Sequence, residues 1–194
     1  EHVDRLLESA HITMLPMPFN KKEVADAIIE TVRVNQLASC YIRPIAYVGY
    51  GAMGIYPGDN PTCLAIAAWP WGSYLGEDAL TKGIRAKISS FTRHHVNVSM
   101  TRAKVSGYYV NSILAKREEK KTGYAECILL DPDGYVAEGT GENVFVVSKG
   151  VLKTTPLTSI LDGITRNAII QLARAKKNSS GRRTIYQGCD VRCR

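Results

Sequence analysis

The 194-residue sequence predicts an α+β chain built in two parts. Apolar residues recur at helical spacing at the start of the chain, whereas strand-like runs bounded by turns dominate later. Between these halves, residues 70–76 combine turn-forming residues with large aromatics and suggest a linker. The expected organisation is a small domain over 1–70, a linker over 71–82, a larger domain over 83–177 and a basic tail over 178–194 that is disordered or foreign to the fold.

Two amphipathic helices are expected at the start of the chain. The first spans residues 3–15 and ends at Pro16. Asn20 and Glu23 have the spacing of a capping box for the second helix, which runs to about Asn35. Two strands follow, at 38–48 and 62–69. Because proline lacks an amide hydrogen, Pro44 predicts an edge position or a bulge in the first of them.

The second part begins with a strand at 84–88 and an irregular polar segment at 89–100. A helix follows Lys104 and ends near Thr122. Two hairpins come next: strands at 126–130 and 135–137 flank an Asp-Pro-Asp-Gly turn, and strands at 143–147 and 151–155 flank a Ser-Lys-Gly turn. The last element expected is a helix over 164–176.

The composition is that of an ordinary globular protein, with 45% hydrophobic and 22% charged residues. No apolar run is long enough for a membrane span, and no signal peptide is visible, so we expect a cytoplasmic protein without membrane association. The net charge of +7 is concentrated from Lys176 onward, where six basic residues accompany one acidic residue. We therefore expect no nucleic-acid binding by the folded part, and the basic tail stays the alternative.

The five cysteines are odd in number, and the first three lie in apolar runs. This pattern favours reduced, buried thiols. Cys189 and Cys193 are separated by three residues, but no second pair follows, so no metal site is predicted.

Residues that suit carbonyl chemistry occur in the second part. Lys104 lies where a loop meets a helix, and such a lysine is positioned to attack a carbonyl carbon. Tyr109 lies one turn later, and Glu138 stands at a strand end before two glycines. Asp162-Gly-Ile-Thr165 opens the last helix with free N–H groups, which suit a phosphate. Together an imine-forming lysine, a carboxylate and a phosphate cradle describe a pyridoxal phosphate site. Taken singly, each residue also fits an ordinary role as a surface, capping or turn residue.

Several stretches resemble bacterial branched-chain amino acid aminotransferases of the fold-type IV pyridoxal phosphate family. They are Ala38-Ser-Cys-Tyr-Ile-Arg-Pro44, Trp69-Pro-Trp-Gly-Ser-Tyr-Leu-Gly76, Arg102-Ala-Lys104, Glu138-Gly-Thr-Gly-Glu-Asn-Val-Phe145 and Leu161-Asp-Gly-Ile-Thr-Arg-Asn-Ala-Ile-Ile170. The resemblance implies a D-amino acid aminotransferase-like two-domain fold, with a small α/β domain and part of a larger barrel-like domain. It also implies pyridoxal 5'-phosphate as cofactor and a homo-oligomer based on a dimer.

The resemblance assigns roles residue by residue. Lys104 would hold the cofactor as an imine and carry the proton between the substrate Cα and the cofactor. Tyr109 would contact the phenolic oxygen of the cofactor, and Glu138 its pyridine nitrogen. Leu161 would pack on the ring, while Ile164 and Thr165 would bind the phosphate. The substrate pocket would be lined by Tyr41, Trp71 and Tyr74, with Arg43 binding the second carboxylate of glutamate or 2-oxoglutarate. Without the resemblance, Arg43 reads as a surface residue and Tyr41 as core.

The implied reaction is transamination between valine, leucine or isoleucine and 2-oxoglutarate. The family also has segments before residue 1 and after about residue 177, so the resemblance implies a chain truncated at both ends. Two alternatives stay open. One keeps the fold and changes the reaction to D-amino acid transamination or aminodeoxychorismate lysis, against which Tyr41 and Arg43 argue. The other is an inactive fragment that exposes apolar surface.

Overall fold

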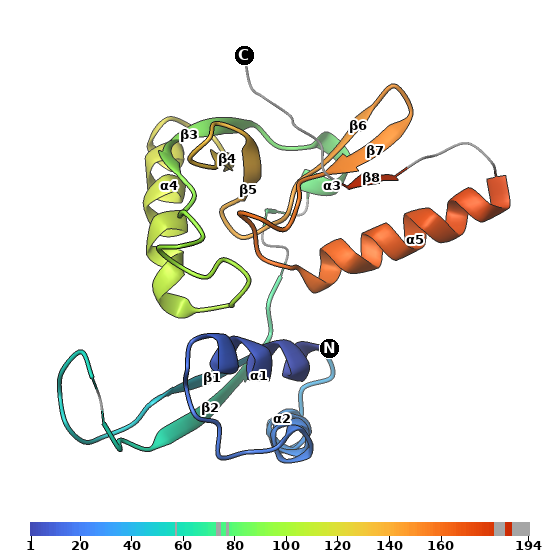
Figure 1. The fold of residues 1–194 in the computed structure, drawn as a ribbon. Helices are drawn as coiled ribbons and strands as arrows, with labels where there is room; N and C mark the ends of the chain where they lie inside the picture. The colour runs from blue at the N-terminus through green and yellow to red at the C-terminus, as the bar shows by residue number, and fades with distance from the viewer. Residues whose placement is uncertain (57, 73–74, 77, 181–184, 188–194) are drawn as a thin grey trace. The chain divides into compact units, whose positions relative to one another are not determined.

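The computed structural model describes residues 1–56, 58–72, 75–76, 78–180 and 185–187, with side chains up to residue 176. The chain divides into two compact units, Glu1–Glu77 and Asp78–Arg194 (Figure 1), and the division falls within the expected linker. Within that linker the chain also forms one short helix, α3 (Ala79–Lys82). Each unit is described by itself below.

The first unit opens with two helices, α1 (His2–Ile12) and α2 (Lys21–Val34). The predicted capping box at α2 is confirmed. The Glu23 amide donates to Asn20 Oδ1 at 3.0 Å, and the Asn20 amide donates to Glu23 Oε2 at 2.7 Å. These bonds satisfy two backbone N–H groups that the first turn of a helix leaves without partners.

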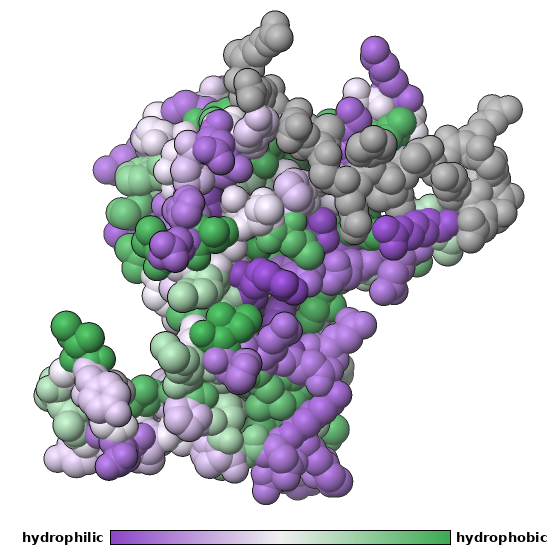
Figure 2. Space-filling model, in the orientation of Figure 1, coloured by the Kyte–Doolittle hydropathy of each residue, from purple (hydrophilic) through white to green (hydrophobic). Residues whose placement is uncertain are grey.

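An antiparallel pair of strands completes this unit. β1 (Tyr41–Val48) pairs with β2 (Thr62–Trp69), in a register that places Tyr41 opposite Trp69. Pro44 takes part without a register shift, since in a two-stranded sheet a proline can direct its missing N–H outward. Figure 2 shows apolar side chains at the tip of the loop joining the strands, at the lower left. The fully or nearly fully exposed apolar residues of this loop are Tyr50, Met53, Ile55 and Tyr56.

The second unit contains a three-stranded sheet in the order β3-β4-β5. β3 (Ala86–Thr92) runs parallel to β4 (Glu126–Leu130), and β4 runs antiparallel to β5 (Val136–Gly139). The expected strand at 84–88 and irregular segment from 89 were wrong in their boundary. Pairing with β4 extends β3 to Thr92, with a register shift between Ile88 and Thr92. The local sequence does not predict this extension, because it depends on the partner strand.

One long helix packs on β3 and β4. A single 3₁₀ turn, η1 (Ser106–Tyr108), leads into this helix, α4 (Tyr109–Lys121). Its buried face consists of Ser112, Ala115 and Glu119 rather than large apolar residues. Small side chains let the helix approach the strands closely, and Ala115 joins Cys127 and Leu129 of β4 in the buried cluster of this unit.

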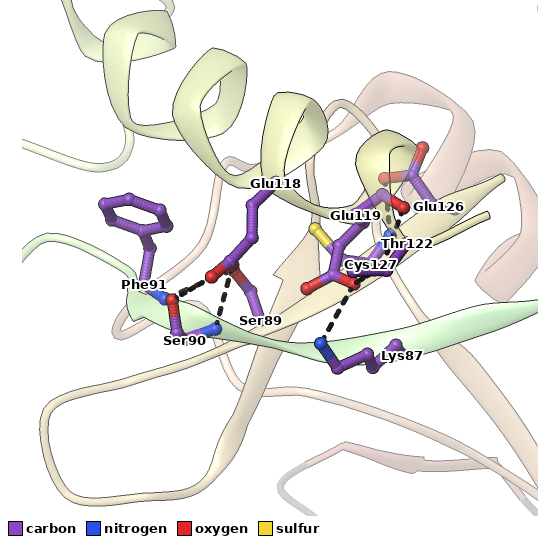
Figure 3. Close-up of polar contacts among 9 residues, drawn as sticks. All are labelled: Lys87, Ser89, Ser90, Phe91, Glu118, Glu119, Thr122, Glu126 and Cys127. Carbon is purple, nitrogen blue, oxygen red and sulfur yellow. Dashed lines mark hydrogen bonds and ion pairs between the residues drawn. The ribbon is translucent and has the colours of Figure 1, made fainter. Parts of the chain in front are cut away.

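Polar contacts also fasten α4 to β3 (Figure 3). Glu118 accepts hydrogen bonds from the hydroxyls of Ser89 and Ser90, at 3.2 and 2.5 Å. The fully buried Glu119 pairs with Lys87, whose Nζ lies 3.4 Å from Glu119 Oε2. Because α4 follows directly on the segment that carries Lys104, these contacts also determine where that segment lies.

A second sheet has the order β6-β7-β8. The predicted hairpin is confirmed: β6 (Phe145–Ser148) and β7 (Val151–Thr154) are antiparallel, and the turn residues Lys149 and Gly150 both have positive φ, at 50° and 76°. Such a two-residue turn matches the natural twist of a hairpin.

The end of the chain differs from the expected patternless tail. The last helix, α5 (Ile164–Ser180), continues past residue 177, and β8 (Ile185–Gln187) pairs in parallel with β7. Edge pairing uses backbone groups, so a strand of this kind forms without an apolar pattern in its own sequence. Among the described residues, no helix combines the length and apolarity needed to cross a membrane.

Candidate active site

Lys104 lies in the turn between β3 and η1, as the sequence predicted. The turn is anchored by buried neighbours: Thr101 is 4% exposed and donates its hydroxyl to the Thr158 carbonyl at 3.4 Å, and Ala103 is 3% exposed. The Lys104 side chain itself is accessible. Its Nζ donates to the Tyr109 hydroxyl at 2.7 Å and lies 5.2 Å from the centre of the Tyr109 ring. The amine and the phenol therefore form one pair.

Glu138 lies on β5 and is nearly inaccessible to solvent. Its Oε1 lies 2.8 Å from Arg93 Nε. Its Oε2 accepts hydrogen bonds from the Leu161 amide and from Asn143 Nδ2, both at 3.2 Å. Burial raises the pKa of the Glu138 carboxyl to about 7, although the charge and hydrogen bonding of Arg93, the hydrogen bond from the Leu161 amide and the charge of Lys104 all act to lower it.

One pocket joins these groups. Lys104, Tyr109, Glu138 and Leu161 all line it, together with Arg93, Asn143 and the loop residues Thr140, Gly141 and Glu142. The structure therefore brings together four of the residues that the sequence proposed for the cofactor. A primary amine and a buried carboxyl on one pocket can bind a carbonyl compound that also carries a basic nitrogen.

The start of α5 is held close to this pocket. Asn143 Nδ2 also donates to the Leu161 carbonyl at 3.0 Å, so one amide ties Leu161 to Glu138. Gly163 lies against the same amide, and a Cβ there would stand 2.0 Å from Asn143 Oδ1. Ile164 and Thr165 begin the helix, with the Thr165 side chain exposed, but they are not among the residues that line the pocket. Their proposed role in phosphate binding stays a prediction.

The first unit presents an aromatic cluster around a guanidinium. Tyr41 and Arg43 share one face of β1, and the register sets Tyr41 opposite Trp69. The ring centres of Tyr41, Trp69 and Trp71 lie 4.8–5.4 Å apart, and Arg43 Cζ is 5.3 Å from the first two. Tyr41 and Trp71 are 40% and 46% exposed, so the cluster is open to solvent rather than core. Tyr74 lies outside the described residues.

Sequence reasoning missed three residues of these two clusters. Arg93 stands in the segment expected to be irregular, and its position at the end of a strand shows only once β3 is known. Asn143 belongs to a quoted stretch, but a glutamate alone was assigned there. Trp69 was assigned only to a strand. Its place in the aromatic cluster follows from the strand register, which sets it opposite Tyr41 and which the sequence did not reveal. Among the described residues, no group of three His, Cys, Asp or Glu side chains is arranged to hold a metal ion.

The sequence profile of the amino-transferase class IV family matches residues 1–186. This chain belongs to that family. The match includes residues 178–186, about half of the segment expected to be foreign. The fold is accordingly the fold-type IV arrangement of mixed helices and strands.

Similar proteins and solved structures that are named as aminotransferases support this family membership. The branched-chain-amino-acid aminotransferase of Pseudomonas aeruginosa is 50% identical over 172 residues, which are 89% of this chain and 56% of that protein. The crystal structure of the Escherichia coli branched-chain amino acid aminotransferase matches with a TM-score of 0.91 and 43% identity, over 96% of this chain and 60% of that one. A second branched-chain amino acid aminotransferase, crystallised in complex with N-(5'-phosphopyridoxyl)-L-glutamate, matches with a TM-score of 0.88 and 41% identity, over 98% of this chain and 60% of that one. This chain thus spans somewhat over half the length of these relatives.

Proposed function

We propose that the protein to which this chain belongs transaminates branched-chain amino acids with pyridoxal 5'-phosphate as cofactor and 2-oxoglutarate as acceptor. One observation carries the proposal: the Lys104–Tyr109 pair and the buried Glu138 carboxyl line the same pocket. The named relatives support the substrate class, and the phosphopyridoxyl-glutamate complex of one relative supports both the cofactor and glutamate.

The residues on the pocket fit this cofactor. The amine of Lys104 is accessible and directed by Tyr109, while the Glu138 carboxyl is shielded from water. In addition, Arg93 lines the pocket, and its Nη1 is buried without a hydrogen-bond partner among the described residues, so this residue has an unused donor. When bound, pyridoxal phosphate supplies an aldehyde that combines with amines and a protonated ring that draws electrons from the substrate Cα.

Lys104 would then have two tasks. Its Nζ would hold the cofactor before substrate arrives, and once released it would take the proton from the substrate Cα and deliver it to C4′ of the cofactor. A positioned base of this kind contributes roughly 10²–10⁴ in rate. The Tyr109 hydroxyl, 2.7 Å away, accepts a hydrogen bond from Nζ and so directs the amine. Without that contact the flexible lysine chain would sample many rotamers.

Glu138 would keep the ring nitrogen of the cofactor protonated. A carboxylate in a water-poor setting interacts strongly with an opposite charge, because the local dielectric is low. The hydrogen bonds from Leu161 and Asn143 fix the orientation of the carboxylate.

The aromatic cluster of the first unit is proposed to bind substrate. The rings of Tyr41 and Trp71 offer apolar surface that suits a branched aliphatic side chain, and the Arg43 guanidinium suits a carboxylate. Assembly into a homo-oligomer is a part of the proposal that comes from the sequence resemblance alone, and a cytoplasmic location is a part that comes from the sequence composition.

The test is to add pyridoxal phosphate to the purified chain and record its visible absorption, then to measure conversion of L-valine to its 2-oxo acid. We expect Lys104→Ala to abolish the absorption band of the cofactor when it is covalently linked to the lysine. Lys120→Ala, which removes an exposed lysine of α4, is the matched control and should leave it unchanged. A Lys104→Ala chain with an unaltered spectrum would refute the assignment. D-alanine and aminodeoxychorismate as alternative substrates separate the rival reactions.

A further inference from the structure

Three groups from three separate segments hold the Glu138 carboxylate. Arg93, just after β3, lies 2.8 Å from Oε1, whereas Asn143 and the Leu161 amide both bind Oε2. Of these, only Arg93 carries a charge. The sequence assigned a role to Glu138 and Leu161 but none to Arg93.

The backbone of Arg93 is fixed independently of its side chain. Its amide donates to the Leu130 carbonyl at 2.7 Å, which ties it to the last residue of β4. The side chains of Arg93 and Glu138 are only 11% and 7% exposed. A buried guanidinium is costly unless an opposite charge faces it, so the two residues stabilise each other's charged forms. Neither group can leave the pair without leaving a buried charge behind.

The surroundings of Glu138 work against its ionisation. Burial is the largest influence on the carboxyl, and the two nearby positive charges that oppose it are Arg93 and Lys104. The remaining titratable groups on the pocket are Tyr108, Tyr109 and Glu142. Lys104 is the proposed cofactor lysine, and its amine must be neutral at the moment it attacks a carbonyl, because the ammonium form has no free electron pair. Arg93 keeps its charge under all working conditions.

We propose that Arg93 is a positioning residue that holds Glu138 as an oriented carboxylate whatever the state of Lys104. The part of this proposal that concerns the cofactor rests on the proposed function. The part that concerns the charge of Glu138 rests on the geometry alone. Arg93 acts through Glu138, so its removal should change the titration of that carboxyl as well as cofactor binding.

The first test uses the cofactor-free chain. The carboxyl of Glu138 is followed by ¹³C NMR during a pH titration, with Glu138→Gln identifying its signal. Arg93→Met keeps the length and removes the charge, and we expect it to raise the pKa of Glu138 by roughly 1–3 units, the usual effect of an adjacent opposite charge. Arg93→Lys restores the charge without the planar fork and should give a smaller rise. Circular dichroism of each variant establishes that it is folded.

Two results would overturn the inference. One is a Glu138 titration that Arg93→Met leaves unchanged, and the other is an Arg93→Lys chain that shifts as far as Arg93→Met. If Arg93→Met fails to fold, Arg93→Gln, which also removes the charge but keeps polar donors, takes its place in the same titration, and an unchanged pKa of Glu138 there would overturn the inference.

A second test uses pyridoxal phosphate binding, measured by absorption at several pH values. We expect Arg93→Met to weaken binding of pyridoxal phosphate at least about tenfold, because a rise of about one unit in the pKa of Glu138 corresponds to a tenfold change in an equilibrium constant. Arg93→Lys should recover part of the loss. If the unsubstituted chain does not bind pyridoxal phosphate, cofactor binding by this chain alone is refuted, and the titration decides whether Arg93 controls the charge of Glu138. If it binds and Arg93→Met binds equally well, the proposed function stands and the inference fails.

Discussion

Gly163 should be required because the Asn143 side chain occupies the space of any Cβ there. An added methyl group would stand 2.0 Å from Asn143 Oδ1 and 3.2 Å from its Cγ, whereas real Cβ atoms do not come within 3.0 Å of other heavy atoms. Gly163→Ala therefore forces the amide to move. That amide donates to the Glu138 carboxylate at 3.2 Å and to the Leu161 carbonyl at 3.0 Å, and both hydrogen bonds would break.

The magnitude follows from these two bonds. A hydrogen bond to a charged group contributes about 1.5–3 kcal/mol and a neutral one about 0.5–1.5 kcal/mol. Replacing glycine by alanine gains about 0.4–1 kcal/mol by restricting the unfolded chain, provided that the backbone allows it. We therefore expect Gly163→Ala to lower the free energy of unfolding by about 1–4 kcal/mol, measured by urea denaturation.

A double-mutant cycle isolates the cause. Asn143→Ala loses the same two hydrogen bonds but leaves room for a methyl group, so adding Gly163→Ala to it should cost nothing further. The two effects should thus be strongly non-additive. Gly141→Ala, on the same loop with no heavy atom within 4 Å of its added Cβ, is the control and should be nearly neutral. If the costs of Gly163→Ala and Asn143→Ala simply add, the clash with Asn143 is not the reason for the glycine.

Two further outcomes are expected. Because the folded chain holds the Glu138 proton up to about pH 7, compared with a normal value of 4.5, it binds more protons than the unfolded chain between these values. Stability should therefore fall as pH rises through this window, and Glu138→Gln should remove that part of the fall in the pH profile of the urea midpoint; an unchanged slope would contradict the assignment. Burial, with the charges of two nearby glutamates, raises the pKa of the Cys127 thiol to about 11. Since the thiolate is the reactive form, iodoacetamide at about pH 8 should modify the partly accessible Cys40 and Cys63 but not Cys127, as judged by peptide mass spectrometry before and after unfolding. Rapid modification of native Cys127 would show that it is not enclosed.

Much of the fold was predictable because its determinants are local. The capping box of α2 depends on residues three apart, and the turn at Gly134 depends on a short run that includes a residue with positive φ. β2 and β4 follow continuous apolar runs and appeared where expected. The boundaries of β3 and the strand β8 were missed because they depend on pairing partners distant in the sequence.

The candidate site likewise has a part that local sequence predicts and a part that depends on contacts between distant segments. Lys104 and Tyr109 are five residues apart, so a turn leading into a helix is enough to bring amine and phenol together, and the sequence alone was sufficient to pair them. It also identified Glu138 as a carboxylate of interest and, through the resemblance, named its expected chemistry. What surrounds that carboxylate was decided by the tertiary structure. The Leu161 amide comes from 23 residues further along, and Arg93 comes from the end of another strand. Burial and the charge of a distant guanidinium set the protonation of Glu138, and both arise only when β3, β5 and the start of α5 pack together, because solvent exclusion is a property of the packed chain and not of any segment within it.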